Sequence, residues 1–143
     1  GMYIFYNLVY TIFAFPLGRL ADKIGLKKMF LFGLMVFSLV YLGMATFTSS
    51  YSFIVLFFAY GIYAAATEGI SKAWISNLVS KEHTATAIGA FSAFQSIGAM
   101  IASSVAGLLW YNFGAEVTFL VTAIATIVVI LYFIIKKSNL TKT

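Results

Sequence analysis

The segment from Gly18 to Lys28, GRLADKIGLKK, is the feature that most constrains this chain, because it places a cluster of charges between two long apolar runs. Charged side chains need contact with water, whereas each flanking run is apolar enough to require lipid as its surroundings. This pattern is typical of a polytopic membrane protein, in which polar turns connect helices that cross the bilayer.

Composition supports the same class. Of the 143 residues, 62% are hydrophobic and 9% are charged, whereas soluble domains carry about 25% charged residues. The absence of cysteine excludes a disulfide framework and thiolate metal sites, and we expect no metal site. The basic residues flank apolar runs, so we expect a lipid bilayer with anionic headgroups as partner, and no nucleic acid.

We expect an all-α membrane protein, a polytopic bundle with five transmembrane helices, over residues 2–17, 29–48, 52–73, 86–110 and 117–135. A hydrocarbon core about 30 Å thick requires about 20 helical residues for each crossing. The runs do not alternate apolar and polar residues, which argues against the strands of a lipid-facing barrel.

The basic residues predict the orientation. With five crossings, the connections at 48–52 and 111–116 fall on one side of the membrane, and neither contains Lys or Arg. The other side carries all nine cations: Arg19, Lys23, Lys27, Lys28, Lys72, Lys81, Lys136, Lys137 and Lys142. Because basic residues favour the cytoplasmic side, we expect a multi-pass protein of the cell membrane with a cytoplasmic C-terminus.

The five runs differ in polarity. The second and fifth hold no charge, Asn or Gln, and we expect them to face lipid. The first and fourth contain Asn7 and Gln95, and the third carries Gly61, Ala65 and Gly69 at the four-residue spacing that lets helices approach closely in lipid. We therefore expect the first, third and fourth runs to form an interior wall.

Glu68 and Lys72 lie one helical turn apart in the third run. A carboxylate within a membrane is costly unless it is paired or neutralised. Glu68 is therefore either half of an internal ion pair with Lys72, whose amine reaches toward water, or a proton-coupling or substrate-contact group. Gln95 and Asn7 have two readings as well: they line a solute cavity, or they form hydrogen bonds between helices.

The basic segment also resembles the signature loop of the major facilitator superfamily, roughly G-x-x-x-D-R/K-x-G-R/K-R/K, with Leu26 in place of one basic residue. The matching positions are Gly18, Asp22, Lys23, Gly25, Lys27 and Lys28. Residues 67–91 look like the junction of the tenth and eleventh helices of that family. The resemblance implies that residues 1–143 are a partial C-terminal bundle, helices eight to twelve of twelve. It also implies that the N-terminal helical bundle of the same protein is a missing partner, and that the signature loop has a gating role.

That resemblance implies a secondary active transporter that moves a small-molecule substrate by alternating access between two helical bundles. Proton-coupled efflux by antiport is a narrower expectation from the same resemblance. The alternative is a non-transporting membrane scaffold or a receptor-like module. We do not expect an enzyme, because no nucleophile–base pair or metal cluster lies within the apolar runs, and we expect no cofactor.

Overall fold

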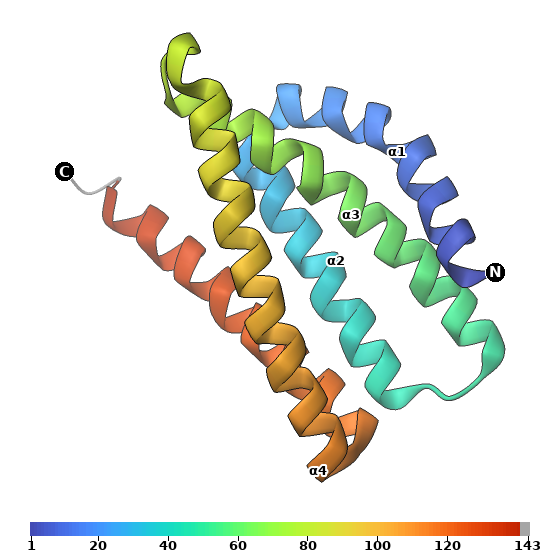
Figure 1. The fold of residues 1–143 in the computed structure, drawn as a ribbon. Coiled ribbons are helices and arrows are strands. Elements are labelled where there is room, and N and C mark those ends of the chain that lie inside the picture. Colours follow the sequence, from blue (N-terminus) through green and yellow to red (C-terminus); the bar gives the residue numbers. More distant parts are fainter. Residues whose placement is uncertain (141–143) are drawn as a thin grey trace.

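The computed structural model describes the backbone of residues 1–140 and the side chains of residues 1–136, and all regular elements in this part of the chain are helices joined by short connections (Figure 1). Its elements are α1 (Met2–Ile24), α2 (Leu26–Thr46), α3 (Ser50–Leu78), the 3₁₀ turn η1 (Lys81–His83) and α4 (Thr84–Leu140). Four of these helices, α1 to α4, are long and apolar enough to cross a membrane. Two of the cations predicted to be cytoplasmic fall outside this description: the side chain of Lys137 and the whole of Lys142.

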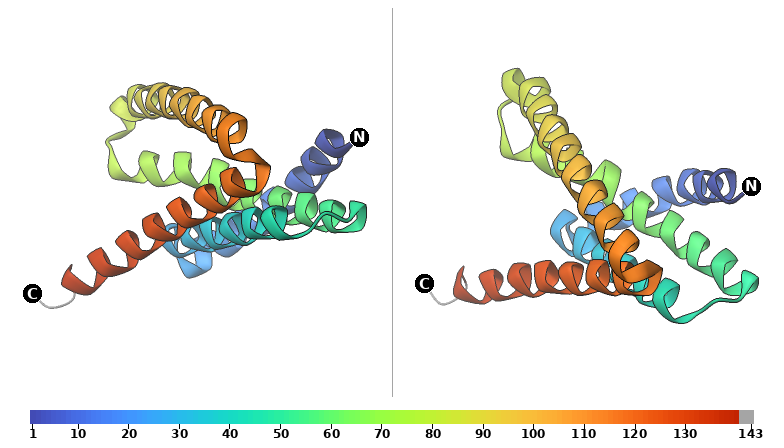
Figure 2. Two further views of the ribbon diagram at one scale, coloured as in Figure 1. Left: turned by 90° about the horizontal axis from the view of Figure 1, so that it is seen from below. Right: turned by 60° about the horizontal axis from the view of Figure 1, so that its bottom comes forward.

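The prediction of five separate helices is wrong in number, because α4 contains both the fourth and the fifth predicted runs. Its backbone leaves helical geometry at one residue, Gly114, with φ 84° and ψ 178°. Figures 1 and 2 show the chain reversing there, so that α4 consists of a first arm, residues 84–113, and a second arm, residues 115–140. A glycine reaches this positive φ without a Cβ clash, and the connection therefore needs no longer loop.

The basic segment is not an extended turn either. α1 continues to Ile24 and α2 begins at Leu26, so Gly25 alone joins them. Gly25 has φ 100°, and its N–H donates to the carbonyl of Ala21 at 2.8 Å. The segment remains helical because helices satisfy their own backbone groups, while long basic side chains extend from helix ends to water.

Helix α3 packs against both α1 and α2, and α2 also packs against α4. Near the turn at Gly25, the buried residues Ala21, Met29, Ala66 and Ile70 form a cluster from three helices. The interhelical contacts also include a polar one, in which the Ser38 hydroxyl donates to the Ala123 carbonyl at 3.4 Å.

The small residues predicted to allow close packing behave differently along the chain. A Cβ added at Gly61 would lie 2.8 Å from the Val9 side chain, so α1 and α3 do approach closely there. At Gly69, an added Cβ would meet no atom within 4 Å among the described residues. The expected close approach is therefore confirmed at Gly61 and not at Gly69.

The connections fall into two groups. The turn at Gly25, the segment 79–83 and the end of α4 lie at one end of the bundle, and the segment 47–49 and Gly114 lie at the other (Figure 1). This arrangement brings the basic segments to a common end, as the expected orientation requires. The assignment of that end to the cytoplasm remains a prediction.

Candidate functional site

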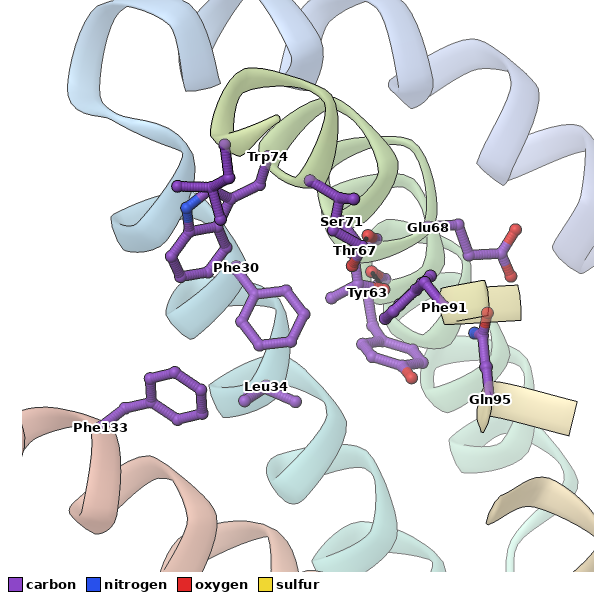
Figure 3. A pocket seen from close by; sticks show the side chains of 12 residues that line it. Phe30, Leu34, Tyr63, Thr67, Glu68, Ser71, Trp74, Phe91, Gln95 and Phe133 are labelled. Atoms are coloured by element: carbon purple, nitrogen blue, oxygen red, sulfur yellow. Dashed lines mark hydrogen bonds between the residues drawn. The ribbon is translucent and has the colours of Figure 1, made fainter. Parts of the chain in front are cut away.

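A cavity of about 510 Å³ lies between α2, α3 and both arms of α4 (Figure 3). Each of these helical segments contributes to its lining. The lining residues are Phe30, Leu34, Tyr63, Thr67, Glu68, Ser71, Trp74, Ile75, Leu78, Phe91, Gln95 and Phe133. The volume falls within the range of about 300–1,000 Å³ that is usual for small-molecule sites.

One side of the cavity is aromatic. The ring centroids of Phe30 and Trp74 are 6.1 Å apart, and those of Phe30 and Phe133 are 6.2 Å apart. The three rings come from α2, α3 and the second arm of α4, so helices distant in sequence build this wall together. Both ring pairs have T-shaped geometry, which is favourable for aromatic contacts.

The other side of the cavity carries its polar groups. Glu68 from α3 lies beside Phe91 and Gln95 from the first arm of α4 (Figure 3). The neighbouring hydroxyls of Thr67 and Ser71 already donate to α3 carbonyls, at 2.9 and 2.6 Å respectively. Their oxygens, like the Glu68 carboxylate, therefore offer acceptors rather than donors to a molecule in the cavity.

Two of the four predicted cavity residues come together here. Glu68 and Gln95 line the cavity, but Lys72 and Asn7 do not. The Asn7 amide donates to the Tyr3 carbonyl at 2.8 Å, within α1. Among the described residues no salt bridge connects Glu68 to Lys72, and both side chains are exposed.

The predicted interior wall requires a correction. Helix α1 contributes no residue to this cavity, whereas α2 and the second arm of α4, both expected to face lipid, contribute Phe30, Leu34 and Phe133. In an apolar run, the sequence alone does not distinguish an aromatic residue that faces lipid from one that lines a cavity. Gly33 was an available signal for α2, since a residue without a side chain often marks the packed side of a helix.

The signature-loop residues do not reach this cavity. Gly18 and Asp22 line a second, smaller cavity of about 190 Å³ between α1, the start of α2 and α3. Lys23 and Lys28 are exposed, and Gly25 forms the turn. The Lys27 Nζ lies 5.8 Å from the centroid of the Phe133 ring, at the aromatic wall of the larger cavity.

Metal binding finds no support in the described part of the chain, residues 1–140. It contains no group of three or more His, Cys, Asp or Glu residues that could hold a metal ion.

The long apolar helices α1 to α4, of which α2, α3 and α4 line this cavity, define the chain as a multi-span membrane protein. The family model of the Major Facilitator Superfamily matches residues 2–142, and the chain belongs to that family. The match confirms the family that the sequence predicted. It also agrees with the expectation that the chain is not an enzyme.

Individual relatives agree. The chain is 41% identical over 128 residues to an uncharacterized MFS-type transporter of Methanocaldococcus jannaschii, covering 90% of this chain and 32% of that protein. It is 28% identical over 137 residues to an uncharacterized transporter of Buchnera aphidicola, covering 94% and 34%. It is 30% identical over 112 residues to a candidate niacin/nicotinamide transporter of Bacillus subtilis, covering 78% and 28%. The chain thus spans about a third of the length of the curated relatives it matches.

Proposed function

We propose that this chain forms helices eight to twelve of a twelve-helix secondary active transporter, which moves a small-molecule solute across the cell membrane by alternating access. The observation that carries this proposal is a cavity of about 510 Å³, lined by Glu68 and Gln95 from two different helices, in a chain of the Major Facilitator Superfamily. Relatives about three times as long leave room for the N-terminal helical bundle against which this bundle moves.

In this proposal α1, α2, α3 and the two arms of α4 each cross the bilayer, which restores five crossings. At about 1.5 Å per residue, the 57 residues of α4 would extend roughly 86 Å as a straight helix, far more than a hydrocarbon core of about 30 Å. The reversal at Gly114 divides it into two arms of 30 and 26 residues (84–113 and 115–140), each long enough to cross.

The orientation can be tested with single cysteines at Ser49 and Ser80, in a cysteine-free background of the whole protein. Ser49 precedes α3 and Ser80 precedes η1, at opposite ends of the bundle, and both are exposed. We expect a membrane-impermeant maleimide added to intact cells to label Ser49→Cys and to leave Ser80→Cys unlabelled until the cells are opened. Labelling of both variants from outside would contradict the proposed topology.

Solute movement can be tested by reconstituting the whole protein in liposomes and measuring the uptake of a panel of radiolabelled small solutes. We expect saturable uptake of at least one solute, absent from protein-free liposomes. Signature-loop gating predicts that Asp22→Asn slows this uptake several-fold and leaves solute binding in detergent unchanged, whereas Glu82→Gln on η1 has neither effect. If no solute is taken up while the protein remains monodisperse, the transport proposal is wrong.

Proton coupling is the narrower proposal, with Glu68 as the group that exchanges a proton for solute during efflux. It is supported by the position of this carboxylate in the lining of the cavity. A transmembrane pH gradient, acidic on the side to which solute is exported, is expected to drive solute movement in the wild-type protein and not in Glu68→Gln. Gradient-driven transport that survives in Glu68→Gln would end the coupling proposal.

A further inference from the structure

We infer that the larger cavity binds an organic cation that combines a protonated amine with an aromatic body. This inference rests on the proposed function, because it names the substrate class of the proposed transporter. It is drawn from the charge, the hydrogen-bonding character and the aromatic content of the cavity lining.

The charge of the lining is one-sided. Among its residues, Glu68 is the only carboxylate, and none is Lys, Arg or His. The nearby Lys27 amine, 5.8 Å from the centroid of the Phe133 ring, lies at the aromatic side and not beside Glu68. Lys72 lies outside the lining, and among the described residues no salt bridge to it neutralises Glu68. A carboxylate in a membrane environment is stabilised by an opposite charge and repels a like one, so this lining favours a cation over an anion.

The hydrogen-bonding groups of the lining also favour a cationic ligand. The Thr67 and Ser71 hydroxyls use their protons on α3 carbonyls, which leaves their oxygens free to accept. Glu68 accepts only, in its ionised form, and the Gln95 amide can accept through its carbonyl oxygen. The acceptor oxygens of Glu68, Thr67 and Ser71 complement an ammonium group, which carries several N–H donors. The Tyr63 hydroxyl, the Trp74 indole N–H and the Gln95 amide leave donors for other groups of the ligand.

The aromatic wall supplies the second half of the recognition. Phe30, Trp74 and Phe133 lie in contact on one side of the cavity, with Tyr63 and Phe91 also in the lining (Figure 3). A cation over an aromatic face is attracted to the ring, and aromatic rings of a ligand stack on it.

Three probes with the same indole body and different charge test the inference: tryptammonium, neutral tryptophol and anionic indole-3-propionate. Their binding to the detergent-purified whole protein can be measured by equilibrium dialysis of radiolabelled tryptamine and by competition. We expect tryptammonium to bind at least tenfold more tightly than either of the others. Equal binding of the anion would overturn the inference.

Variants of the protein give the matched test. Glu68→Gln is expected to weaken tryptammonium binding at least tenfold, Glu68→Asp to retain affinity within about threefold, and Glu82→Gln to change nothing. Trp74→Leu is expected to weaken it by about 3- to 30-fold. Trp110→Leu, outside the lining, is expected to leave it unchanged. Wild-type affinity in a monodisperse Glu68→Gln protein would refute the inference. If that variant does not fold, the probe series and the tryptophan pair decide.

Failure of this inference is distinguishable from failure of the proposed function. Dialysis in detergent needs no transport, whereas uptake into liposomes does. Selective tryptammonium binding without uptake of any solute would support the site and contradict the transporter. Uptake of another solute by a protein that does not bind tryptammonium would support the transporter and contradict the site.

Discussion

The contact between α2 and α3 at Gly33 gives the sharpest prediction of stability. A Cβ added at Gly33 would lie 2.5 Å from the Thr67 Cγ2 and 3.2 Å from the Ala66 Cβ. Ala66 is 0% exposed and Thr67 is 6% exposed, and the Thr67 hydroxyl is bonded to the Tyr63 carbonyl. A β-branched side chain in a helix has little freedom to rotate away, so α3 itself must shift to admit the methyl group.

The magnitude follows from two opposing effects of Gly33→Ala. Overpacking a tight contact costs about 1–3 kcal/mol, and the better helix propensity of alanine recovers up to about 1 kcal/mol. We expect a net loss of about 1–2 kcal/mol in the free energy of unfolding, since the contact is buried. In a whole protein about three times the length of this chain, that loss corresponds to a fall of roughly 1–3 °C in the melting temperature, because the entropy of unfolding grows with chain length. The assay is the temperature at which half of the monodisperse size-exclusion peak of the whole protein is lost.

A rescue variant separates this clash from other effects. Thr67→Ser removes the clashing methyl and keeps the hydroxyl, so the double variant Gly33→Ala/Thr67→Ser is expected to melt above Gly33→Ala alone. Gly43→Ala is the matched control, because its Cβ would meet Leu56 Cδ2, the far end of a flexible side chain, and the loss should be smaller. Gly33→Ala with wild-type stability, or no rescue by Thr67→Ser, would refute the reasoning.

The remaining predictions use the same melting assay. Gly25→Ala places a Cβ at φ 100° and is expected to lower the free energy of unfolding by about 1–3 kcal/mol. Gly18→Ala, within α1, is the control and should cause no such loss; equal melting temperatures of the two variants would contradict this. Gly114→Ala, at φ 84°, is expected to cost about as much, with Gly107→Ala in the first arm as its control. Ser38→Ala loses one long interhelical hydrogen bond and is expected to cost about 0.6 kcal/mol; a loss above about 2 kcal/mol would show that this bond does more than expected.

The membrane class, the helical content and the approximate positions of the apolar runs could be predicted from the sequence. These features depend on composition and on the length of apolar runs, which lipid imposes directly. The ends of the helices could not be predicted. The charges between Gly18 and Lys28 suggested a loop, yet one glycine with positive φ replaces it, and the same happens at Gly114.

The candidate site was predictable only in part. Glu68 and Gln95 stood out because polar residues are costly within an apolar run, and both line the cavity. Asn7 has the same signal but bonds within its own helix. Phe30 and Phe133 gave no signal, since the rotation of each helix about its axis depends on packing against helices distant in sequence.

The single-residue joint at Gly25 has a mechanical consequence. Because Gly25 alone joins α1 and α2, the end of one helix cannot move far without moving the start of the other. Asp22 lies near the end of α1, and Phe30 lies near the start of α2 in the aromatic wall. If the proposed N-terminal bundle displaces Asp22, that displacement would reach Phe30 in the aromatic wall over a few residues, with no loop between them to absorb it.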